Sequence, residues 1–198
     1  MLGILGGTFD PIHLGHIRMA EIALEELNLN KLYMLPSGDP PHKIKESSAT
    51  HRYNMTVLAC KKNERLFVSK LEIDRKGISY TLDTLVEIKK LFPKEPIMLI
   101  VGSDSLHSFP SWHEPKKIAA LCSMAVVLRN EESSDLQPVL ENLKENFNLK
   151  AQVFKQKGLN ISSTQIRKLI HQSKDISPFL PKEVYQYIQE NRLYRINQ

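Results

Sequence analysis

The chain has 198 residues, 41% of them hydrophobic and 25% charged, and its formal net charge is +5 at pH 7. This composition is typical of one globular domain, and no run approaches the roughly 18 apolar residues of a membrane helix. Basic and acidic residues are interleaved, so no continuous nucleic-acid surface is evident and small phosphorylated ligands fit the charge at least as well. The first strand begins directly after Met1 without a signal peptide, and Cys60 and Cys122 lie in apolar helical patterns, so we expect reduced thiols in a cytoplasmic protein.

The first sixteen residues predict a strand, a glycine loop and the start of a helix. Residues 2–5 are an apolar run, residues 6–11 (Gly-Gly-Thr-Phe-Asp-Pro) have turn chemistry, and a helical period begins near Leu14. His13 and His16 are three residues apart, so both imidazoles should project from one side of the helix N-terminus. The unpaired N–H groups and partial positive charge at that end favour an anion. The segment therefore predicts a phosphate site, although it is neither a Walker A loop nor a Gly-x-Gly-x-x-Gly loop.

Strands and helices alternate along the rest of the chain. This alternation predicts an α/β fold, a Rossmann-like doubly wound parallel sheet with helices on both faces. We expect one domain over 1–198, with a C-terminal helical segment of about 162–192 packed on it. Further strands are predicted at 31–36, 66–71, 96–101, 124–128 and 151–154, and helices at about 50–62, from 82 to 91, at 137–147, and in segments after 161 and 181.

Ligands of such folds bind beyond the carboxyl ends of the strands. The loops that start at Gly6, Ser37 and Gly102 are therefore expected to open onto one crevice, with Gly102-Ser103-Asp104 as the third loop and Trp112 just past it. The helix of about 50–62 carries the apolar residues Tyr53, Val57, Leu58 and Cys60.

Two segments carry hydroxyl or basic groups near predicted loops and helix starts. The loop 37–46 contains Pro40-Pro41-His42-Lys43, a rigid turn that presents two basic side chains. Ser-Tyr-Thr-Leu-Asp-Thr at 79–84 starts a helix, with Ser79 or Thr81 as its predicted N-cap.

The segment 161–167, Ile-Ser-Ser-Thr-Gln-Ile-Arg, predicts a second anion site. Ser162 and Ser163 lie at the start of a helix, and Arg167 is one turn further along the same face as Ser163. Hydroxyls, helix N–H groups and a guanidinium can then converge on one anion. We expect this segment to face the first phosphate motif.

Taken together, these motifs resemble the bacterial nicotinate-nucleotide adenylyltransferases of the nucleotidyltransferase superfamily, over nearly the whole chain. The motifs at 6–16 and 161–167 are shared across the superfamily, whereas those at 40–43 and 79–84 and Trp112 favour this member. The resemblance implies transfer of AMP from ATP to nicotinate mononucleotide, which yields nicotinate adenine dinucleotide and pyrophosphate in NAD biosynthesis. It also implies Mg²⁺ held mainly by the ATP phosphates, with no metal ligand from the protein.

The resemblance further implies roles for individual residues. It gives His13, His16, Lys43 and Arg167 a part in the chemistry. Implied contacts to ATP are Gly6, Gly7, Thr8, Phe9, Asp10, His13, His16, Gly102, Asp104, Ile161, Ser162, Ser163, Thr164 and Arg167. Implied contacts to the mononucleotide are Thr8, Lys43, Thr81, Ser103, Asp104, Trp112 and Arg129. One departure weakens the case for Arg129, because the family often continues with Pro-Gly where this chain has Asn130 and Glu131.

Three alternatives remain beside this interpretation. Phosphopantetheine adenylyltransferases share both phosphate motifs, but they are usually shorter and are not expected to carry the segment at 79–84. The His-Leu-Gly-His run also resembles class I aminoacyl-tRNA synthetases, but a Lys-Met-Ser-Lys-Ser-like loop is missing. A basic nucleic-acid-binding module is the third, although the expected partners are small molecules, not nucleic acid or a membrane. The preference for nicotinate over nicotinamide, a homo-oligomeric state, any regulation and the role of His42 stay open.

Overall fold

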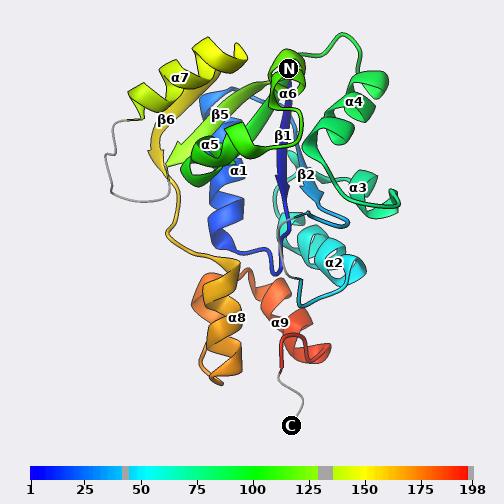
Figure 1. The fold of residues 1–198 in the computed structure, drawn as a ribbon. Coiled ribbons are helices and arrows are strands. Elements are labelled where there is room, and N and C mark those ends of the chain that lie inside the picture. Colours follow the sequence, from blue (N-terminus) through cyan, green and yellow to red (C-terminus); the bar gives the residue numbers. More distant parts are fainter. Residues whose placement is uncertain (42–44, 129–135, 196–198) are drawn as a thin grey trace.

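The computed structural model describes residues 1–41, 45–128 and 136–195. Within these ranges, six parallel strands form one sheet in the order β3-β2-β1-β4-β5-β6 (Figure 1). The order reverses between β1 and β4, so the predicted doubly wound sheet is confirmed, and its switch point lies at the end of β1. The strands are β1 (Leu2–Gly7), β2 (Leu32–Pro36), β3 (Leu66–Val68), β4 (Ile97–Gly102), β5 (Ser123–Leu128) and β6 (Ala151–Lys157).

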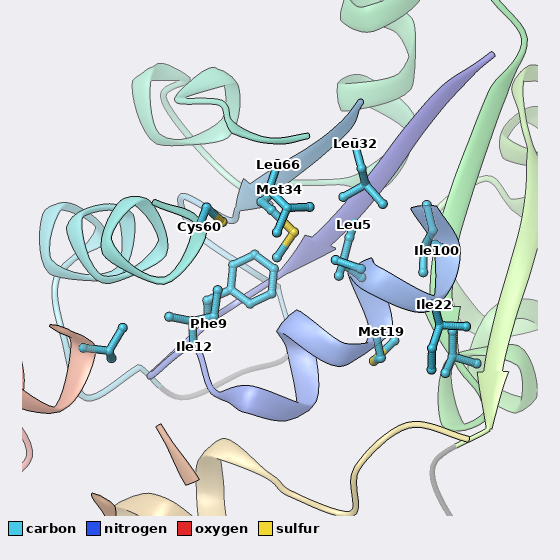
Figure 2. Close-up of a cluster of buried hydrophobic side chains, with 14 of the residues drawn as sticks. Leu5, Phe9, Ile12, Met19, Ile22, Leu32, Met34, Cys60, Leu66 and Ile100 are labelled. Atoms are coloured by element: carbon cyan, nitrogen blue, oxygen red, sulfur yellow. The ribbon is translucent and has the colours of Figure 1, made fainter. Parts of the chain in front are cut away.

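Alternating side chains of the strands divide the core into two layers. Ile4, Leu99 and Val101 belong to one buried cluster, whereas their neighbours Leu5 and Ile100 belong to the other. This follows from the pleat, which sends successive side chains to opposite faces. Figure 2 shows the second cluster, in which the ring of Phe9 lies close to Met34 and Leu5.

Helices cover both faces, as expected for a parallel sheet. One layer packs on α1 (Leu14–Glu26), α2 (Ala49–Cys60), α8 (Ser163–His171) and α9 (Lys182–Glu190). The other packs on α4 (Thr81–Leu91), α5 (Ser103–Ser108), α6 (Pro115–Leu121) and α7 (Gln137–Phe147). A short α3 (Leu71–Asp74) and the 3-10 turns Phe109–Ser111 and Ser177–Phe179 complete the described elements. None of the helices in these ranges combines the length and apolar character needed to cross a membrane.

The helices α8 and α9 lie beyond the carboxyl ends of the strands (Figure 1). Val184 and Ile188 of α9 are buried. The Tyr187 hydroxyl accepts a hydrogen bond from Asn54 Nδ2 at 3.0 Å and lies 2.9 Å from His51 Nδ1, which joins α9 to α2. The C-terminal helix α9 therefore packs against α2 beyond the carboxyl ends of the strands.

Several expected details of the elements are wrong. The strand that begins at Leu66 ends at Val68 rather than at 71, because residue 71 is already the first residue of α3. The expected loop at 102–104 is instead the start of α5, with Gly102 as its N-cap residue. The N-cap residue of α4 is Tyr80, which makes no capping bond with its side chain, so neither Ser79 nor Thr81 has the predicted capping role.

The buried face of α2 includes two polar side chains. The residues that α2 buries are Arg52, Met55, Thr56 and Cys60, whereas Val57 is 40% exposed. The helix turns two polar side chains inward because each finds a carbonyl: Thr56 Oγ1 donates to Arg52 O at 2.7 Å, and Arg52 bonds loops of the site. Cys60 and Cys122 are buried free thiols, as predicted, and burial raises the pKa of each to about 12.

Candidate active site

A cavity of about 1170 Å³ opens at the carboxyl ends of β1, β2 and β4. The loops after these strands line it through Gly6, Ser37 and Gly102, which confirms that they share one crevice. The start of α8 contributes Ser162, Ser163, Thr164 and Arg167, so the two predicted phosphate motifs meet in the same space. The cavity therefore has the location that doubly wound folds use for ligands.

Two histidines lie at the start of α1, on one side of this cavity. His13 is the N-cap residue and is 2% exposed, and His16 is the third residue of the helix. Their rings stack with centroids 3.7 Å apart, and the edge of Phe9 approaches His16 with centroids 4.9 Å apart. The predicted projection from one side of the helix is thus confirmed.

The hydrogen bond of His16 fixes which of its nitrogens carries a proton. The His13 backbone N–H donates to His16 Nδ1 at 3.3 Å, so Nδ1 acts as an acceptor. A neutral imidazole whose Nδ1 accepts carries its proton on Nε2. His16 Nε2 is therefore a hydrogen-bond donor, the polarity that a phosphate oxygen requires.

Glycines leave the room that these rings occupy. A Cβ at Gly15 would lie 2.9 Å from His13 Nδ1, and a Cβ at Gly7 would lie 2.6 Å from Cε1 of Phe9. Both distances are below ordinary contact, so side chains at these positions would displace the rings. Phe9 itself has a φ of 53° and is fully buried, which places its ring under the loop.

Gly6 differs from these glycines, because a Cβ there would meet nothing within 4 Å. Its backbone lies in β1 and lines the cavity, so a methyl group would project into ligand space. We expect Gly6→Ala to leave the folded protein as stable as before, or about 0.5–1 kcal/mol more stable through the lower entropy of the unfolded chain. The resemblance described above implies that ATP contacts Gly6, and a methyl group there would occupy part of that space, so the KM for ATP should rise about tenfold or more.

Urea unfolding and initial rates at varied ATP measure the two effects of Gly6→Ala separately. Gly3→Ala is the matched control, since a Cβ at Gly3 would lie 2.5 Å from Leu29 Cδ1 in the core. That variant should lose stability while its KM for ATP stays near the wild-type value. An unchanged KM in Gly6→Ala would show that ATP does not approach this strand end.

Arg167 joins the two phosphate motifs directly. Its NH1 donates to the carbonyl of Asp10 at 2.8 Å, and its Nε donates to Glu46 Oε1 at 2.7 Å. Glu46 Oε2 also lies 3.1 Å from His171 Nε2, one turn along α8. The guanidinium is thereby held at the cavity wall by a backbone carbonyl and a carboxylate.

The hydroxyls at the start of α8 have distinct partners. Ser163 Oγ donates to the carbonyl of Pro11 at 2.9 Å, a contact across 152 residues. Ser162 accepts from Gln165 N at 3.1 Å and so caps the helix. These bonds fix α8 against the loop after β1 and aim its N-terminal N–H groups at the cavity.

Asp10 is a buried junction beneath the phosphate motifs. Its carboxylate accepts hydrogen bonds from Glu46 N at 2.8 Å, from the Ser47 hydroxyl, and from the Tyr194 hydroxyl at 2.7 Å. Burial, followed by the charge of Asp10, raises the pKa of Tyr194, so its phenol remains a donor. Asp10 lines the cavity, but its carboxylate is already engaged by three donors.

Another part of the cavity is lined by aromatic and hydroxyl side chains from the start of α4 and from the segment after α5. Trp112 is half-buried and packs on Phe109 with ring centroids 5.5 Å apart, and its Nε1 donates to Ser108 Oγ at 3.3 Å. Tyr80 packs on His113 with centroids 4.3 Å apart. The rings of Tyr80, Trp112 and His113 line the cavity with Thr81, so part of its surface is aromatic.

Glu72 is an unexpected buried carboxyl of this wall. It is 8% exposed, accepts from Thr84 Oγ1 at 2.7 Å, and lines the cavity. Burial raises its pKa to about 7, and hydrogen bonds from Thr84 and Ser79 and the charge of Arg75 offset only part of that effect.

Between pH 4.5 and 7 the folded protein therefore keeps a proton on Glu72 that the unfolded chain has released. Its contribution to stability is fully present below about pH 4.5 and is lost as the pH rises through about 7. We expect Glu72→Gln to remove a pH-dependent contribution on the order of 2 kcal/mol across that window. Urea unfolding of both proteins at a series of pH values measures it, with the exposed Glu190→Gln as control. Parallel curves for wild type and Glu72→Gln would contradict the raised pKa.

The cavity gathers most but not all of the residues predicted for the site. Ser103, Asp104 and Ile161 are not among the residues that line it, because the first two have turned into α5 and Ile161 packs partly against the core. Lys43, His42 and Arg129 lie outside the described residues. The predicted residues that do line it are Gly6, Gly7, Thr8, Phe9, Asp10, His13, His16, Thr81, Gly102, Trp112, Ser162, Ser163, Thr164 and Arg167.

Sequence reasoning missed three charged residues in or beside the site, namely Glu72 on the cavity wall and Glu46 and Arg52 next to it. Arg52 and Glu72 are charged residues in positions that the fold buries. The signal for Arg52 was its spacing three and eight residues before Met55 and Cys60, which places it on the buried stripe. Glu46 and Glu72 left no comparable signal, since each acts through a partner distant in sequence.

Among the described residues, no group of three or more His, Cys, Asp or Glu side chains is arranged to hold a metal ion. The carboxylates on the cavity wall are those of Asp10 and Glu72, and both already accept hydrogen bonds from the protein.

The switch-point cavity, the helix N-termini aimed into it and the paired histidines define a nucleotide-binding α/β protein of the phosphate-transferring kind. Residues 4–169 match the model of the Cytidylyltransferase-like family, and this chain belongs to that family.

Relatives of similar length resemble the whole chain. A protein of Desulfitobacterium hafniense (strain DSM 10664 / DCB-2), named probable nicotinate-nucleotide adenylyltransferase, is 40% identical over 98% of this chain and 96% of its own. A protein of Clostridium botulinum (strain Hall) with the same name is 37% identical over 97% and 98%. Among solved structures, Plasmodium falciparum nicotinic acid mononucleotide adenylyltransferase complexed with NaAD has a TM-score of 0.82 at 24% identity, over 98% of this chain and 96% of that one, which establishes the shared fold.

Proposed function

We propose that this protein is a nicotinate-nucleotide adenylyltransferase, which transfers AMP from ATP to nicotinate mononucleotide and releases pyrophosphate. The observation that carries the proposal is the single cavity shared by two phosphate motifs and the wall of Thr81 and Trp112. Relatives that bear this name match the chain along nearly its full length, which supports the same activity.

The chemistry of this reaction fits a site without a nucleophilic side chain. The mononucleotide phosphate has its second pKa near 6, so at pH 7 it is largely a dianion and can attack the α-phosphorus of ATP directly. The α-phosphorus–oxygen bond to the β-phosphate then breaks, and pyrophosphate leaves with the electron pair. The protein must align the two polyanions and stabilise the charge that develops.

His16 is the group best placed to stabilise the α-phosphate, since its Nε2–H is a donor held by the stack with His13. Arg167, with the hydroxyls and N–H groups at the start of α8, would hold the β- and γ-phosphates. Lys43 would add positive charge from the loop after β2. Gly6 and Gly7 would let the strand end approach the nucleotide closely.

The wall of Thr81 and Trp112 would receive the mononucleotide. The indole face of Trp112 is suited to stacking on a pyridine ring, and the Thr81 hydroxyl to binding a carboxylate. Ser103, Asp104 and Arg129 remain candidates for contacts to this substrate, although Ser103 and Asp104 do not line the cavity. A nucleotide spanning both walls would place its phosphates near His16.

Mg²⁺ would enter as part of the ATP complex, where it neutralises phosphate charge. The cavity offers it no free set of carboxylates, which suits a metal bound through phosphates and water.

The test is pyrophosphate release with ATP and Mg²⁺, with nicotinate mononucleotide, nicotinamide mononucleotide and phosphopantetheine offered in parallel. Turnover with the first acceptor, and its loss in His16→Ala, is the expected result. Release only with phosphopantetheine would assign the protein to that activity instead. If no pyrophosphate is released with any of the three acceptors, the proposal is overturned.

A further inference from the structure

Arg52 is a fully buried cation next to the site that touches none of the cavity. It is 0% exposed, projects from α2, and ranks among the largest fully buried side chains of the described residues. Within those residues no carboxylate forms an ion pair with it. Burial lowers its pKa from the ordinary value, and the charge of Asp10 offsets part of that effect.

Backbone carbonyls of two loops take the place of a carboxylate. Arg52 NH1 donates to the carbonyl of Thr8 at 2.9 Å and also to that of Ser37, and NH2 donates to the carbonyl of Gly38 at 2.8 Å. Thr8 belongs to the phosphate loop after β1, whereas Ser37 and Gly38 follow β2. One planar guanidinium thus spans the two loops, which are the walls of the cavity.

Further hydrogen bonds connect the loop after β2 to the part of the cavity that Thr81 and Trp112 line. Gly38 N and Asp39 N donate to Ser79 Oγ at 3.1 and 3.0 Å, and Ser79 directly precedes Tyr80 and Thr81. A Cβ at Gly38 would lie 2.1 Å from the carbonyl oxygen of Glu72, so this loop packs tightly against the backbone of Glu72. The path from Thr8 through Arg52 and Gly38 to Ser79 therefore joins the phosphate loop to the wall that carries Thr81.

A buried guanidinium is a costly way to fill a core. Apolar side chains of similar volume often stabilise a protein as well or better, because they avoid desolvating a charge. What a guanidinium supplies, and an apolar side chain does not, is a rigid fork that fixes the separation of several carbonyls. The same fixed separation is what a two-substrate reaction requires.

We propose that Arg52 is a positioning residue that sets the placement of the ATP subsite relative to the mononucleotide subsite. The inference rests on the proposed function, which supplies the two subsites. Arg52 is not among the residues that line the cavity, so its effect should be seen only when both subsites are used at once. A misplacement of about 1 Å between reacting groups can lower a rate about 100-fold.

The test compares Arg52→Lys with wild type in calorimetric titrations with three ligands. Lysine keeps the charge, but its single ammonium group does not reproduce the fork. ATP alone, with Mg²⁺, and nicotinate mononucleotide alone should each bind within about threefold of wild type, because each uses one subsite. Nicotinate adenine dinucleotide, which spans both, should bind about tenfold or more weakly, and kcat should fall about 100-fold.

A purely structural role predicts a different pattern. Partial unfolding lowers the binding stoichiometry and the melting temperature but not the Kd of the folded molecules, and Leu143→Ala in α7, which removes a buried side chain far from the cavity, provides that reference. Loss of all three affinities in parallel, or of stoichiometry alone, would overturn the proposal. Failure of wild type to bind the mononucleotide would instead count against the proposed function.

Ser79→Ala is the second variant, in case Arg52→Lys does not fold. It removes the acceptor for Gly38 N and Asp39 N at the far end of the same path and leaves Arg52 in place. We expect the same pattern of affinities: nicotinate adenine dinucleotide should bind more weakly than to wild type, whereas ATP and nicotinate mononucleotide should each bind as before. If folded Ser79→Ala binds all three ligands with wild-type affinity, that result would contradict the path.

Discussion

His16→Ala is expected to lower kcat about 100- to 1000-fold while the KM for ATP changes by less than about fivefold. The reason lies in the position of the side chain rather than in its charge. His16 Nδ1 accepts from the His13 backbone, so Nε2 is a fixed donor, and the proposed function places this donor at the α-phosphate. Such a donor acts most strongly on the charge that develops in the transition state, which makes the effect one on kcat.

Initial rates of pyrophosphate release at saturating mononucleotide measure this change. His107→Ala is the matched control, because His107 is exposed on α5 and is not among the residues that line the cavity. It should retain the wild-type kcat. A fall below about tenfold for His16→Ala would contradict its assignment to the transition state.

Asp10→Ala is expected to lower the free energy of unfolding by about 3–5 kcal/mol. The change leaves three donors without their acceptor in a buried place, namely Glu46 N, the Ser47 hydroxyl and the Tyr194 hydroxyl. Leaving buried donors unsatisfied costs much more than a net hydrogen bond contributes. Urea unfolding at pH 7 measures the loss.

Asp10→Asn is the control for shape, since its amide oxygen can still accept one of these bonds. It should cost less than half as much as the alanine variant. Tyr194→Phe, alone and combined with Asp10→Ala, completes a double-mutant cycle that isolates the bond between the two side chains. Additive effects of the two substitutions would show that this bond contributes little.

The architecture was predictable because it depends on patterns repeated along the chain. The continuous apolar run that ends at Gly102 and the alternation of strands and helices require a parallel sheet, and such a sheet places its ligands beyond the strand ends. The spacing of His13 and His16 likewise determines their common side on α1. Local periodicity was therefore sufficient for the fold and for the phosphate end of the site.

Contacts between distant segments were not predictable in the same way. Ser79 looked like a helix cap, but its hydroxyl oxygen instead accepts hydrogen bonds from Gly38 and Asp39, 41 and 40 residues earlier in the chain. Arg52 donates to the carbonyls of Thr8 and Gly38, 44 and 14 residues earlier in the chain, and no local pattern indicates these partners. A sequence pattern records the face of an element, whereas these roles depend on what lies opposite.

The contact between Tyr194 and Asp10 joins positions 184 residues apart. Contacts of such separation form late, because a long loop must close before they are gained. Synthesis begins at the N-terminus, so the loop with Asp10 leaves the ribosome long before Tyr194 does. During translation the growing chain can assemble its sheet, but the junction beneath its phosphate motifs remains incomplete until the turn after α9 has emerged.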